Sequence, residues 1–529
     1  MSALLSADDL NDFIKPGAAC IKPLEQPAVQ TAGEVEIQID ENGQPLEISK
    51  IDGKISALVP AQISLSDCLA CSGCITSAEE VLVAQHSHEQ FLRTLRYASK
   101  TFVVSISHQS RVSLAHAYGC SLSHMDRLLI AFFKNQLGFA YVVGTALGRK
   151  LLLLEEALRM LRKKTAALSA CTPHKPVLSS ICPGWVLYAE KTHPHVLPYI
   201  SQVKSTQQIT GTLLKELTAC ELGCSRSDIY HLSIMPCFDK KLESARTEQD
   251  DLGSPDVDCV LTAKELVQLV NASEYELFPQ KDSGEPTGET KQMSDLYASC
   301  APQNWPFKDL LWSNDSGSES GGYGFSYIQA MKEHLLRTDP SYAAEKFAVV
   351  TVEGKNSDVY ELRLTYDGQK LASAAVVNGF RNIQNLVRKL KPTAAPSTKA
   401  NSLALRRRAR VGVRVSASPL PVPEDPADSS KADYVEVMAC PSGCINGGGQ
   451  IARPQTTPEK EWLAEAKALY WQVSPVDVIG DTDLADRLTG WVTAFFKQSG
   501  ISRTRLYDSH FNEVEKPTDP AAMTFGTKW

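Results

Sequence analysis

Three cysteines near the start of the chain have the spacing of an iron–sulfur ligand set. The segment SDCLACSGC has the form C-x2-C-x2-C and carries Cys68, Cys71 and Cys74. Three thiolates at this spacing can wrap one corner of an iron–sulfur cube, and the small residues between them let backbone N–H groups face its sulfides. Bacterial ferredoxins continue such a run with a fourth cysteine, whereas Ala78 stands at that place here. We therefore expect Cys20, farther upstream, to complete the set.

These cysteines have two other interpretations, a zinc site and no metal at all. Zinc needs four tetrahedral ligands and more often uses paired C-x2-C units, so three thiols in so short a run suit it poorly. A disulfide framework is also disfavoured for the 14 cysteines of the chain. The first thirty residues lack the apolar core of a signal peptide, so we expect a cytosolic protein whose thiols stay reduced. A cluster is the favoured interpretation.

The remaining cysteines have to be placed on predicted strands. Short β-branched or apolar runs recur along the chain, and helical patterns such as RKLLLLEEALRMLRKK follow several of them. This alternation predicts βαβ units, mostly parallel sheets and an α/β fold. The expected strands are TFVVSIS (101–107), FAYVVG (139–144), PVLSS (176–180), IYHLSIM (229–235), DCVLT (258–262), FAVVTVEG (347–354) and DYVEVM (433–438). Ligands of such sheets lie beyond the carboxyl ends of the strands.

Four cysteines fall at those strand ends, in the motifs SSICPGW, MPCFDKK and MACPSGC; they are Cys182, Cys237, Cys440 and Cys444. Proline after Cys182 and after Cys440 predicts helix starts, whose dipole favours a thiolate. The four-residue spacing of Cys440 and Cys444 predicts two thiolates on one helical face. Gly443 and the run Gly447–Gly449 are expected to leave room for a bulky inorganic ligand. We interpret the four thiols as one site; the alternative is four separate buried thiols that pack as small hydrophobes.

These motifs resemble the three loops that hold the active-site cluster of iron-only hydrogenases, in the eukaryotic NARF-like branch that serves cytosolic iron–sulfur protein assembly. The similarity runs from Cys20 to the C-terminal region and includes MPCFDKKLE and VMACPSGCINGGGQ. It implies an α/β fold of two lobes with mostly parallel sheets, plus a small N-terminal ferredoxin-like segment. It also implies two 4Fe–4S clusters. The first would be held by Cys20, Cys68, Cys71 and Cys74, and the second, buried between the lobes, by Cys182, Cys237, Cys440 and Cys444.

The departures from that family bear on activity. Hydrogenases that turn over hydrogen have a second cysteine directly before the first-loop ligand, where it serves the proton path, but this chain has Ile181. An isoleucine cannot pass on a proton. The residues that match the lining of the diiron pocket are Met235, Lys240, Glu243 and Met438. The resemblance therefore implies a shaped pocket without its relay, and we expect no catalytic residues; a hydrogen-converting redox enzyme is the alternative.

We expect four parts along the chain. They are an N-terminal iron–sulfur segment (1–95), a first α/β lobe (96–260), a second α/β lobe (261–455) and a small-subunit-like helical region with the C-terminal tail (456–529). Flexible insertions are expected in the second lobe near 279–322 and 391–431, since both stretches are polar or rich in Pro, Ser and Ala. The basic run Arg406–Arg410 in the second insertion is interpreted as a solvated charge run, the alternative being a nuclear-import or acidic-partner patch.

Composition narrows the classes of partner. The formal net charge of −7 argues against direct binding of nucleic acid, which usually requires a basic excess. No stretch approaches the roughly 18–20 uninterrupted apolar residues of a spanning helix, so we expect no transmembrane segment. The polar tail FGTKW ends in Trp529, and an exposed aromatic of this kind is a good anchor for a partner pocket. The alternative is a mere disordered end.

By resemblance, a C-terminal tryptophan docks on the cytosolic iron–sulfur targeting complex, through its β-propeller subunit and associates. An upstream cluster scaffold is the other expected partner. We therefore expect a cytoplasmic factor, with a nuclear pool as a further expectation, that relays clusters or acts as an adaptor to the targeting complex. A third alternative is a binding protein whose clusters only stabilise its fold.

Overall fold

The computed structural model describes three N-terminal strands and, from His86 onward, most of the chain. The described ranges are 35–39, 45–49, 55–57, 86–170, 175–246, 254–277, 290–391, 426–454 and 456–514. The chain divides into two compact units, Met1–Cys68 and Leu69–Trp529. In the first unit, an antiparallel sheet has the order β1-β2-β3, with the strands β1 (Val35–Ile39), β2 (Pro45–Ser49) and β3 (Ile55–Ala57).

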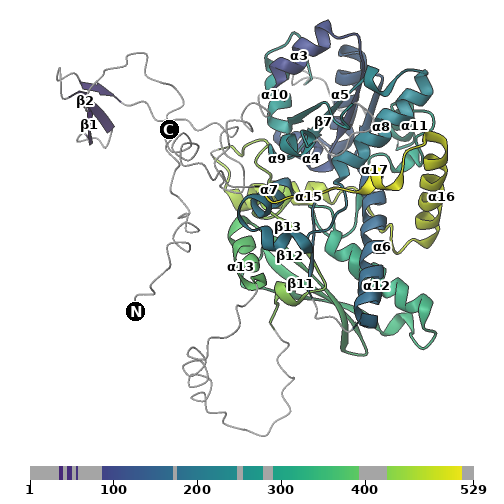
Figure 1. The fold of residues 1–529 in the computed structure, drawn as a ribbon. Helices are drawn as coiled ribbons and strands as arrows, with labels where there is room; N and C mark the ends of the chain where they lie inside the picture. Colours follow the sequence, from purple (N-terminus) through teal and green to yellow (C-terminus); the bar gives the residue numbers. More distant parts are fainter. Residues whose placement is uncertain are drawn as a thin grey trace. The chain divides into compact units, whose positions relative to one another are not determined.

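The second unit contains a fully parallel sheet with the order β5-β4-β7-β8; Figure 1 labels its strand β7. Its strands are β4 (Thr101–Ile106), β5 (Tyr141–Gly144), β7 (Ile229–Met235) and β8 (Cys259–Thr262). These apolar runs are buried almost throughout, as strands covered on both faces by helices must be. The helices α8 (Thr206–Leu222) and α10 (Ala263–Asn271) pack against this sheet. The sequence prediction of a parallel α/β lobe is confirmed here.

A second sheet has the order β10-β11-β12-β13-β6 and is mixed. Its strands are β6 (Val177–Leu178), β10 (Phe347–Glu353), β11 (Val359–Tyr366), β12 (Gln369–Asn378) and β13 (Tyr434–Met438). The pairs β12–β13 and β13–β6 are parallel, whereas β10, β11 and β12 form an antiparallel meander. A two-residue turn with positive φ at Asp367 and Gly368 joins β11 to β12. The strand predicted at 347–354 is thus present as β10, but it is a largely exposed edge strand in the antiparallel part of the sheet.

The two sheets interleave along the sequence. Strand β6 belongs to the segment expected for the first lobe, yet it pairs with β13 in the second sheet. The long helix α6 (Ala146–Ala170) packs against both α8 and α12 (Tyr323–Thr338), and α12 lies on β12. Buried apolar side chains from both sheets form one contiguous core cluster. The two sheets therefore share a single core. The boundaries expected between the lobes stay a prediction.

Further helices complete the second unit. They are α3 (His88–Tyr97), α4 (His108–Ala117), α5 (Leu122–Ile130), α7 (Pro183–Thr192), α9 (Asp239–Ser244), α11 (Thr290–Ser299), α13 (Phe380–Leu390), α15 (Glu459–Tyr470), α16 (Thr482–Ser499) and α17 (Arg503–Tyr507), with a π-helix at Ala131–Gln136. The short strands β9 (Asn314–Asp315) and β14 (Pro475–Val476) pair in parallel. Within the described residues, no helix has the length and apolar character needed to cross a membrane.

The segment 290–322 is structured, contrary to the expectation of a flexible insertion. It contains α11 and β9, and two of its serines, Ser318 and Ser320, are buried and take part in hydrogen bonds. Ser318 donates to Glu436 at 2.6 Å, and the backbone N–H of Cys444 donates to Ser320 at 3.0 Å. The polar residues of this segment thus form hydrogen bonds to other parts of the fold, which is why a polar sequence was not a sign of flexibility here. The rest of that insertion, 279–289, and residues 392–425, with the Arg406–Arg410 run, lie outside the described residues.

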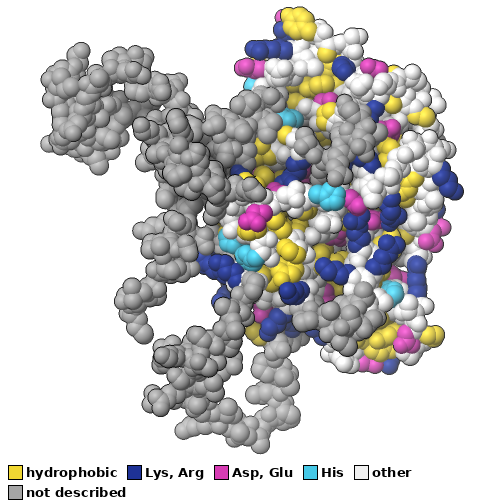
Figure 2. Space-filling model, viewed as in Figure 1, with side chains coloured by type: hydrophobic (Ala, Val, Ile, Leu, Met, Phe, Trp, Pro, Cys, Tyr) yellow, Lys and Arg dark blue, Asp and Glu magenta, His cyan; other side chains and the backbone are white. Residues whose placement is uncertain are grey.

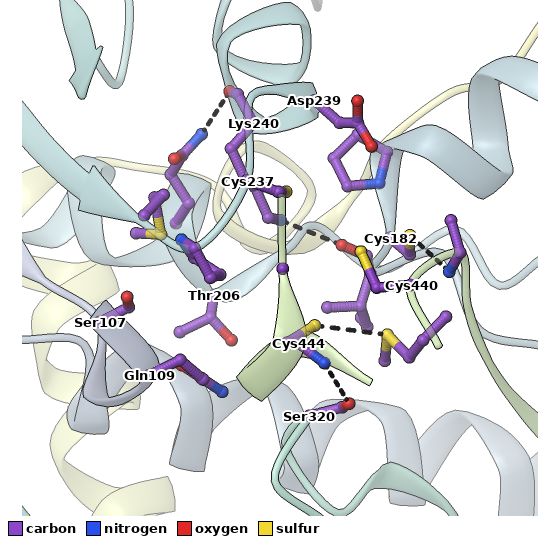
Figure 3. Close-up of a pocket in the computed structure, with 18 of the residues that line it drawn as sticks. Ser107, Gln109, Cys182, Thr206, Cys237, Asp239, Lys240, Ser320, Cys440 and Cys444 are labelled. Carbon is purple, nitrogen blue, oxygen red and sulfur yellow. Dashed lines mark hydrogen bonds between the residues drawn. The ribbon is translucent and has the colours of Figure 1, made fainter. Parts of the chain in front are cut away.

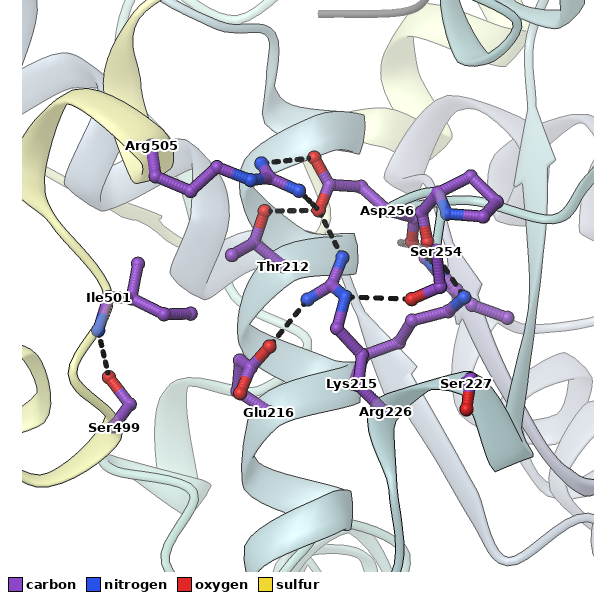
Figure 4. A network of polar contacts seen from close by, with 12 residues as sticks. Thr212, Lys215, Glu216, Arg226, Ser227, Ser254, Asp256, Ser499, Ile501 and Arg505 are labelled. Carbon is purple, nitrogen blue, oxygen red and sulfur yellow. Dashed lines mark hydrogen bonds and ion pairs between the residues drawn. The ribbon is translucent and has the colours of Figure 1, made fainter. Parts of the chain in front are cut away.

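A buried carboxylate, Asp256, joins the C-terminal helix α17 to the first sheet (Figure 4). It accepts hydrogen bonds from Arg505 at 2.8 and 2.9 Å, from Arg226 at 2.5 Å and from Thr212 at 2.8 Å. Lys204 lies 3.3 Å away. Burial alone would raise the pKa of Asp256, but these cations hold it well below its usual range. The C-terminal segment is thus fixed to the parallel sheet by a charged contact.

The surface carries scattered apolar side chains among charged ones, as one face shows in Figure 2. Among the described residues, the large hydrophobic side chains that are exposed lie on separate parts of the chain: Tyr97, Tyr118, Leu158, Leu222, Val349 and Val514. Scattered single residues of this kind are normal for a folded surface.

Candidate metal centre

Four cysteines from three loops surround one cavity (Figure 3). They are Cys182, Cys237, Cys440 and Cys444, and the cavity has a volume of about 60 Å³. Cys182 follows β6, Cys237 follows β7, and the other two follow β13. A single water needs only about 10–15 Å³ on this measure, so the cavity admits a larger group. The structure thus brings the four predicted thiols together at the carboxyl ends of three strands.

Cys182 is held at the start of a helix. It is the N-cap of α7, and Pro183 occupies the first turn as the sequence predicts. The backbone N–H of Ala439, from the β13 loop, donates to Cys182 Sγ at 3.3 Å. Gly184 lets the Asp239 carboxylate lie against this first turn, because a Cβ there would come within 2.4 Å of Asp239 Oδ2. The helix start is therefore packed against both other cysteine loops.

The loop that carries Cys440 and Cys444 is a turn and not a helix, contrary to the sequence prediction. Ser442 and Gly443 have φ values of 59° and 80°, which a right-handed helix does not allow, and the short 3₁₀ helix begins only at Cys444. Pro441 therefore does not start a helix. Both thiols still line the cavity, because the turn itself aims them there.

The glycines of this loop make room for protein neighbours. A Cβ on Gly443 would lie 2.3 Å from Ser320 Oγ, and a Cβ on Gly447 would lie 2.4 Å from the carbonyl oxygen of Pro236. We expected these glycines to leave space for a ligand directly, but the space beside Gly443 and Gly447 is taken by Ser320 and Pro236. They let the β13 loop approach the Cys237 loop and Ser320, which brings the thiols to one cavity.

A buried ion pair borders the cavity beside Cys444. Lys240 Nζ lies 2.9 and 3.0 Å from the carboxylate oxygens of Glu243 and donates to the carbonyl oxygen of Ile181 at 3.0 Å. Glu243 also accepts hydrogen bonds from Ser205 at 2.7 Å and Gln207 at 3.2 Å. The Lys240 ammonium is thereby fixed in place at the cavity wall.

Burial and mutual proximity oppose ionisation of the four thiols. Burial raises the pKa of Cys182 to about 12, and Cys444 and Asp239 add to that shift. Burial likewise raises the pKa values of Cys237 and Cys440 well above the usual range and, to a lesser degree, that of Cys444. The Ser320 hydroxyl and Lys240 partly offset the rise in the pKa of Cys444. The expected lowering by the helix dipole at Cys182 is thus outweighed by burial.

This donor set fits an iron–sulfur cluster. Thiolates crowded in a buried cavity need a cationic partner, and metal ions supply it while displacing the thiol protons. Four cysteines around a cavity are the ligand set of a 4Fe–4S cluster, and hydrogen bonds to the sulfurs are typical of such sites. Among the described side chains, no three His, Cys, Asp or Glu converge closely enough for a single metal ion. The four thiols enclose a volume, as a cluster requires.

The other predicted site residues lie outside the described residues: Cys20, Cys68, Cys71, Cys74 and Trp529. Several residues that line the cavity were not predicted from the sequence; they are Ser107, Gln109, Thr145, Arg149, Thr206, Asp239, Ser320 and Tyr323. Most of them stand directly after a predicted strand or in the first turn of a helix, and this position is the signal that could have identified them.

Comparisons with known proteins identify the family and the fold of the chain. Residues 100–448 match the family model described as iron only hydrogenase large subunit, C-terminal domain. The chain is similar in fold to a solved structure of an apo [FeFe]-hydrogenase HydA1 from Chlamydomonas reinhardtii, a variant with one cysteine replaced by histidine. That match has a TM-score of 0.55 and 20% identity, and covers 81% of this chain and 99% of that one. At this identity the likeness concerns the fold.

Similarity to curated proteins extends over the full chain. A protein of Scheffersomyces stipitis named cytosolic Fe-S cluster assembly factor NAR1 is 55% identical, with 100% of each chain covered. The proteins of the same name in Debaryomyces hansenii and Saccharomyces cerevisiae are 54% and 38% identical, covering 100% and 88% of this chain and 100% and 89% of theirs. With this identity, the matching family model and the fold, the chain belongs to the family of NAR1 cytosolic Fe-S cluster assembly factors, which are iron-only hydrogenase-like proteins.

Proposed function

We propose that the protein is a cytosolic iron–sulfur cluster assembly factor with two 4Fe–4S clusters. Cys182, Cys237, Cys440 and Cys444 would hold one cluster in the cavity, and Cys20, Cys68, Cys71 and Cys74 the other. The protein would relay clusters or act as an adaptor in the maturation of cytosolic and nuclear iron–sulfur proteins. The names of its relatives support the assembly role and the cytosolic location.

The convergence of four thiols on one cavity carries the proposal. They come from loops far apart in sequence, and a hydrogen bond to sulfur from Ala439 and the hydroxyl of Ser320 favour their thiolate forms. Four unrelated buried cysteines would have no reason to meet in this way. The proposal of a second cluster depends on the N-terminal motif, and the spacing of the cysteines in that motif supports it.

The C-terminal tail supplies the proposed partner contact. The described chain ends at Val514, which is half exposed, and the tail continues to Trp529. A terminal tryptophan offers a large apolar anchor at low entropic cost, suited to a pocket on the β-propeller subunit of the targeting complex. An upstream cluster scaffold is the second proposed partner.

A hydrogenase-type redox enzyme is the second candidate, because Met235, Met438 and Lys240 line the cavity. Ile181 counts against it. Its side chain is buried and lines the cavity directly before Cys182, where a hydrocarbon offers no atom that can carry a proton. We therefore propose a non-catalytic assembly role.

The test is maturation of a cytosolic iron–sulfur enzyme in yeast cells depleted of their own NAR1 protein. The wild-type chain should restore the activity of that client, whereas Cys182→Ser and Cys444→Ser should fail. Cys259→Ser, which alters a buried cysteine on β8 away from the cavity, is the matched control and should restore it. Restoration by the cavity variants would overturn the proposal. Sustained hydrogen evolution by the purified, iron-replete protein with a reduced viologen would instead favour the second candidate.

A further inference from the structure

A buried carboxyl group lies behind the thiol cavity, on the strand that leads to two of its cysteines. Glu436 is on β13, four residues before Cys440, and its side chain is fully buried. It is not part of the cavity wall. The proposed function gives this group no role, although a buried carboxyl close to a site of changing charge is a common functional group.

Hydrogen-bond donors hold Glu436 in place. Ser318 Oγ donates to one carboxyl oxygen at 2.6 Å, and the backbone N–H of Gly324 donates to the other at 2.9 Å. Ser318 Oγ itself accepts the backbone N–H groups of Ser320 at 3.2 Å and Gly322 at 3.1 Å, so its own proton is directed at the carboxyl. The groups that act most strongly on the pKa of Glu436 include no Lys, Arg or His. An ionised Glu436 is therefore a buried charge that hydrogen bonds alone stabilise.

The surroundings of Glu436 act on its pKa in both directions. Burial raises the pKa of Glu436, and the neighbouring Glu319 carboxylate adds to the rise. Hydrogen bonds from Ser318, Gly324 and the backbone of Tyr323 oppose it. Burial thus favours the neutral form, while the three donors make the carboxylate attainable.

The titratable groups that face Glu436 carry no positive charge. They are Glu319 before α12, Tyr323 on α12, Tyr360 on β11, Tyr434 on β13 and Cys444 in the cysteine loop. The neighbouring strand β12 presents the apolar Val376 beside it. Arg149 acts on Tyr323 and Cys444, but its guanidinium is held by the Tyr470 hydroxyl at 3.3 Å and lies 3.6 Å from Asp315. No cation of this set fixes Glu436 in its charged form.

A chain of hydrogen bonds links Glu436 to Cys444. It runs from Glu436 to Ser318 at 2.6 Å, and from Ser318 Oγ to the backbone N–H of Ser320 at 3.2 Å. Ser320 Oγ then accepts the backbone N–H of Cys444 at 3.0 Å, the contact that Figure 3 shows below the cavity. The carboxyl is thus joined to a proposed cluster ligand through two serines. Charges in a protein interior interact more strongly than in water, so a negative charge gained at the cluster increases the proton affinity of Glu436.

We propose that Glu436 takes up a proton when the cluster held at Cys444 is reduced, so that the net charge of the buried site stays the same. In this step one electron from a low-potential one-electron donor enters the cluster, and one solvent proton adds to a carboxylate oxygen of Glu436. No other bond forms or breaks. The inference rests on the proposed function for the cluster itself, and it adds an electron-accepting property that depends on pH through Glu436.

The experiment measures the midpoint potential of the cavity cluster by redox titration with electron paramagnetic resonance, at a series of pH values between about pH 6 and pH 9. The reconstituted full-length chain carries Cys71→Ser, so that the cavity cluster alone gives the signal. The potential should fall as the pH rises, by up to roughly 59 mV for each tenfold fall in proton concentration, which is the limit for one proton per electron. Glu436→Gln should make the potential independent of pH.

Two further variants test the carboxyl more closely. Ser318→Ala removes a donor that favours the carboxylate, so Glu436 stays protonated to a higher pH and the pH range in which the potential falls should shift upward. This variant also tests the inference if Glu436→Gln does not fold. Glu361→Gln is the matched control at a buried carboxyl on β11, which pairs with Arg363 at 2.9 Å and Lys370 at 2.7 Å, and it should keep the unsubstituted pH dependence.

An iron-replete protein whose potential does not change with pH would overturn the inference and leave the proposed function intact. The inference is also overturned by a pH dependence that remains in Glu436→Gln, or by one that Ser318→Ala leaves in the same pH range. Loss of the dependence in Glu361→Gln would likewise contradict the role of Glu436. Iron counts on the same samples separate the two proposals, because fewer than about four iron atoms in the Cys71→Ser protein would contradict the cavity cluster itself.

Discussion

The backbone N–H of Ala439 donates a hydrogen bond to the Sγ of Cys182 at 3.3 Å, although 257 residues separate the two. The contact joins the loop after β13 to the helix start after β6. These two strands are parallel neighbours in the second sheet, so their carboxyl ends meet at one edge. The thiol cavity is thus a product of strand order, and it exists only when the second sheet is assembled.

Removal of the Ser320 hydroxyl should change the redox potential of the cavity cluster without removing the cluster. The hydroxyl lies at Cys444 and favours its charged form, as hydrogen bonds to cluster sulfurs do. Such bonds stabilise the more negative, reduced cluster. A bond of about 0.5–1.5 kcal/mol corresponds to roughly 20–60 mV for one electron, so Ser320→Ala should lower the midpoint potential by that amount.

Redox titration followed by electron paramagnetic resonance measures this shift. Ser313→Ala, which removes a hydroxyl that donates to the carbonyl oxygen of Leu310 at 2.8 Å and does not line the cavity, serves as the control. An unchanged potential in Ser320→Ala with a full iron content would show that this hydroxyl does not act on the cluster.

Asp256→Asn should strongly destabilise the protein. The substitution leaves Lys204, Arg226 and Arg505 without their shared carboxylate in a buried place, which typically costs about 3–5 kcal/mol. Arg505→Met should cost less, about 1–3 kcal/mol, because two cations remain on Asp256. Urea unfolding measures both. Arg487→Met breaks an exposed ion pair with Asp483 on α16, and its free energy of unfolding should stay within roughly 0.5 kcal/mol of the wild-type value. Equal effects of all three variants would refute the importance of this contact.

Acid should destabilise the protein below about pH 6.5 through two buried histidines. Burial lowers the pKa values of His86 and His231 from 6.5 to about 4, so the folded state keeps both neutral where the unfolded state binds protons. The contribution to stability is present above pH 6.5 and is lost as the pH falls toward 4. The loss is about 2 kcal/mol per histidine between pH 7 and pH 5. Urea unfolding at a series of pH values should show a shallower slope for His231→Gln, and an identical slope would contradict the assignment.

Much of the fold could be predicted because apolar runs and helical periodicity report burial directly. The strands β4, β5, β7, β8 and β13 lie within a residue or two of the expected runs. Strand β10 has an equally apolar sequence, yet it is an exposed edge strand, since composition does not reveal which strands will be neighbours. The β11–β12 hairpin was missed although Asp367-Gly368 is a typical two-residue turn signal.

The four cysteines that line the cavity could be predicted from the sequence, but the residues around them could not. Cysteine motifs at strand ends identified the four thiols, but the backbone between Cys440 and Cys444 was misread as a helix. Four-residue spacing suits a helix and a turn equally, and only the positive φ of Ser442 and Gly443 distinguishes them. Arg149 was missed because a single arginine in a helical pattern carries no signal until tertiary packing buries it.

Loss of the terminal tryptophan should separate docking from cluster binding. Deletion of Trp529 should leave the iron content of the purified protein unchanged but weaken its capture by the β-propeller subunit of the targeting complex by roughly tenfold or more, since an aromatic anchor is typically a hot spot. Measurement of the affinity for the purified subunit tests this. The control is Tyr97→Ala, which removes an exposed aromatic side chain far in sequence from the tail. Undiminished binding without Trp529 would show that the contact lies elsewhere.

The most direct test of the account is the iron and sulfide content of anaerobically reconstituted protein. The wild type should hold about eight iron atoms, and Cys444→Ser or Cys182→Ser should hold about four, because one of two 4Fe–4S clusters is lost. Cys259→Ser should keep the wild-type content, since Cys259 is buried on β8 outside the cavity. An unchanged content in both cavity variants would contradict the claim that the four converging thiols hold a cluster.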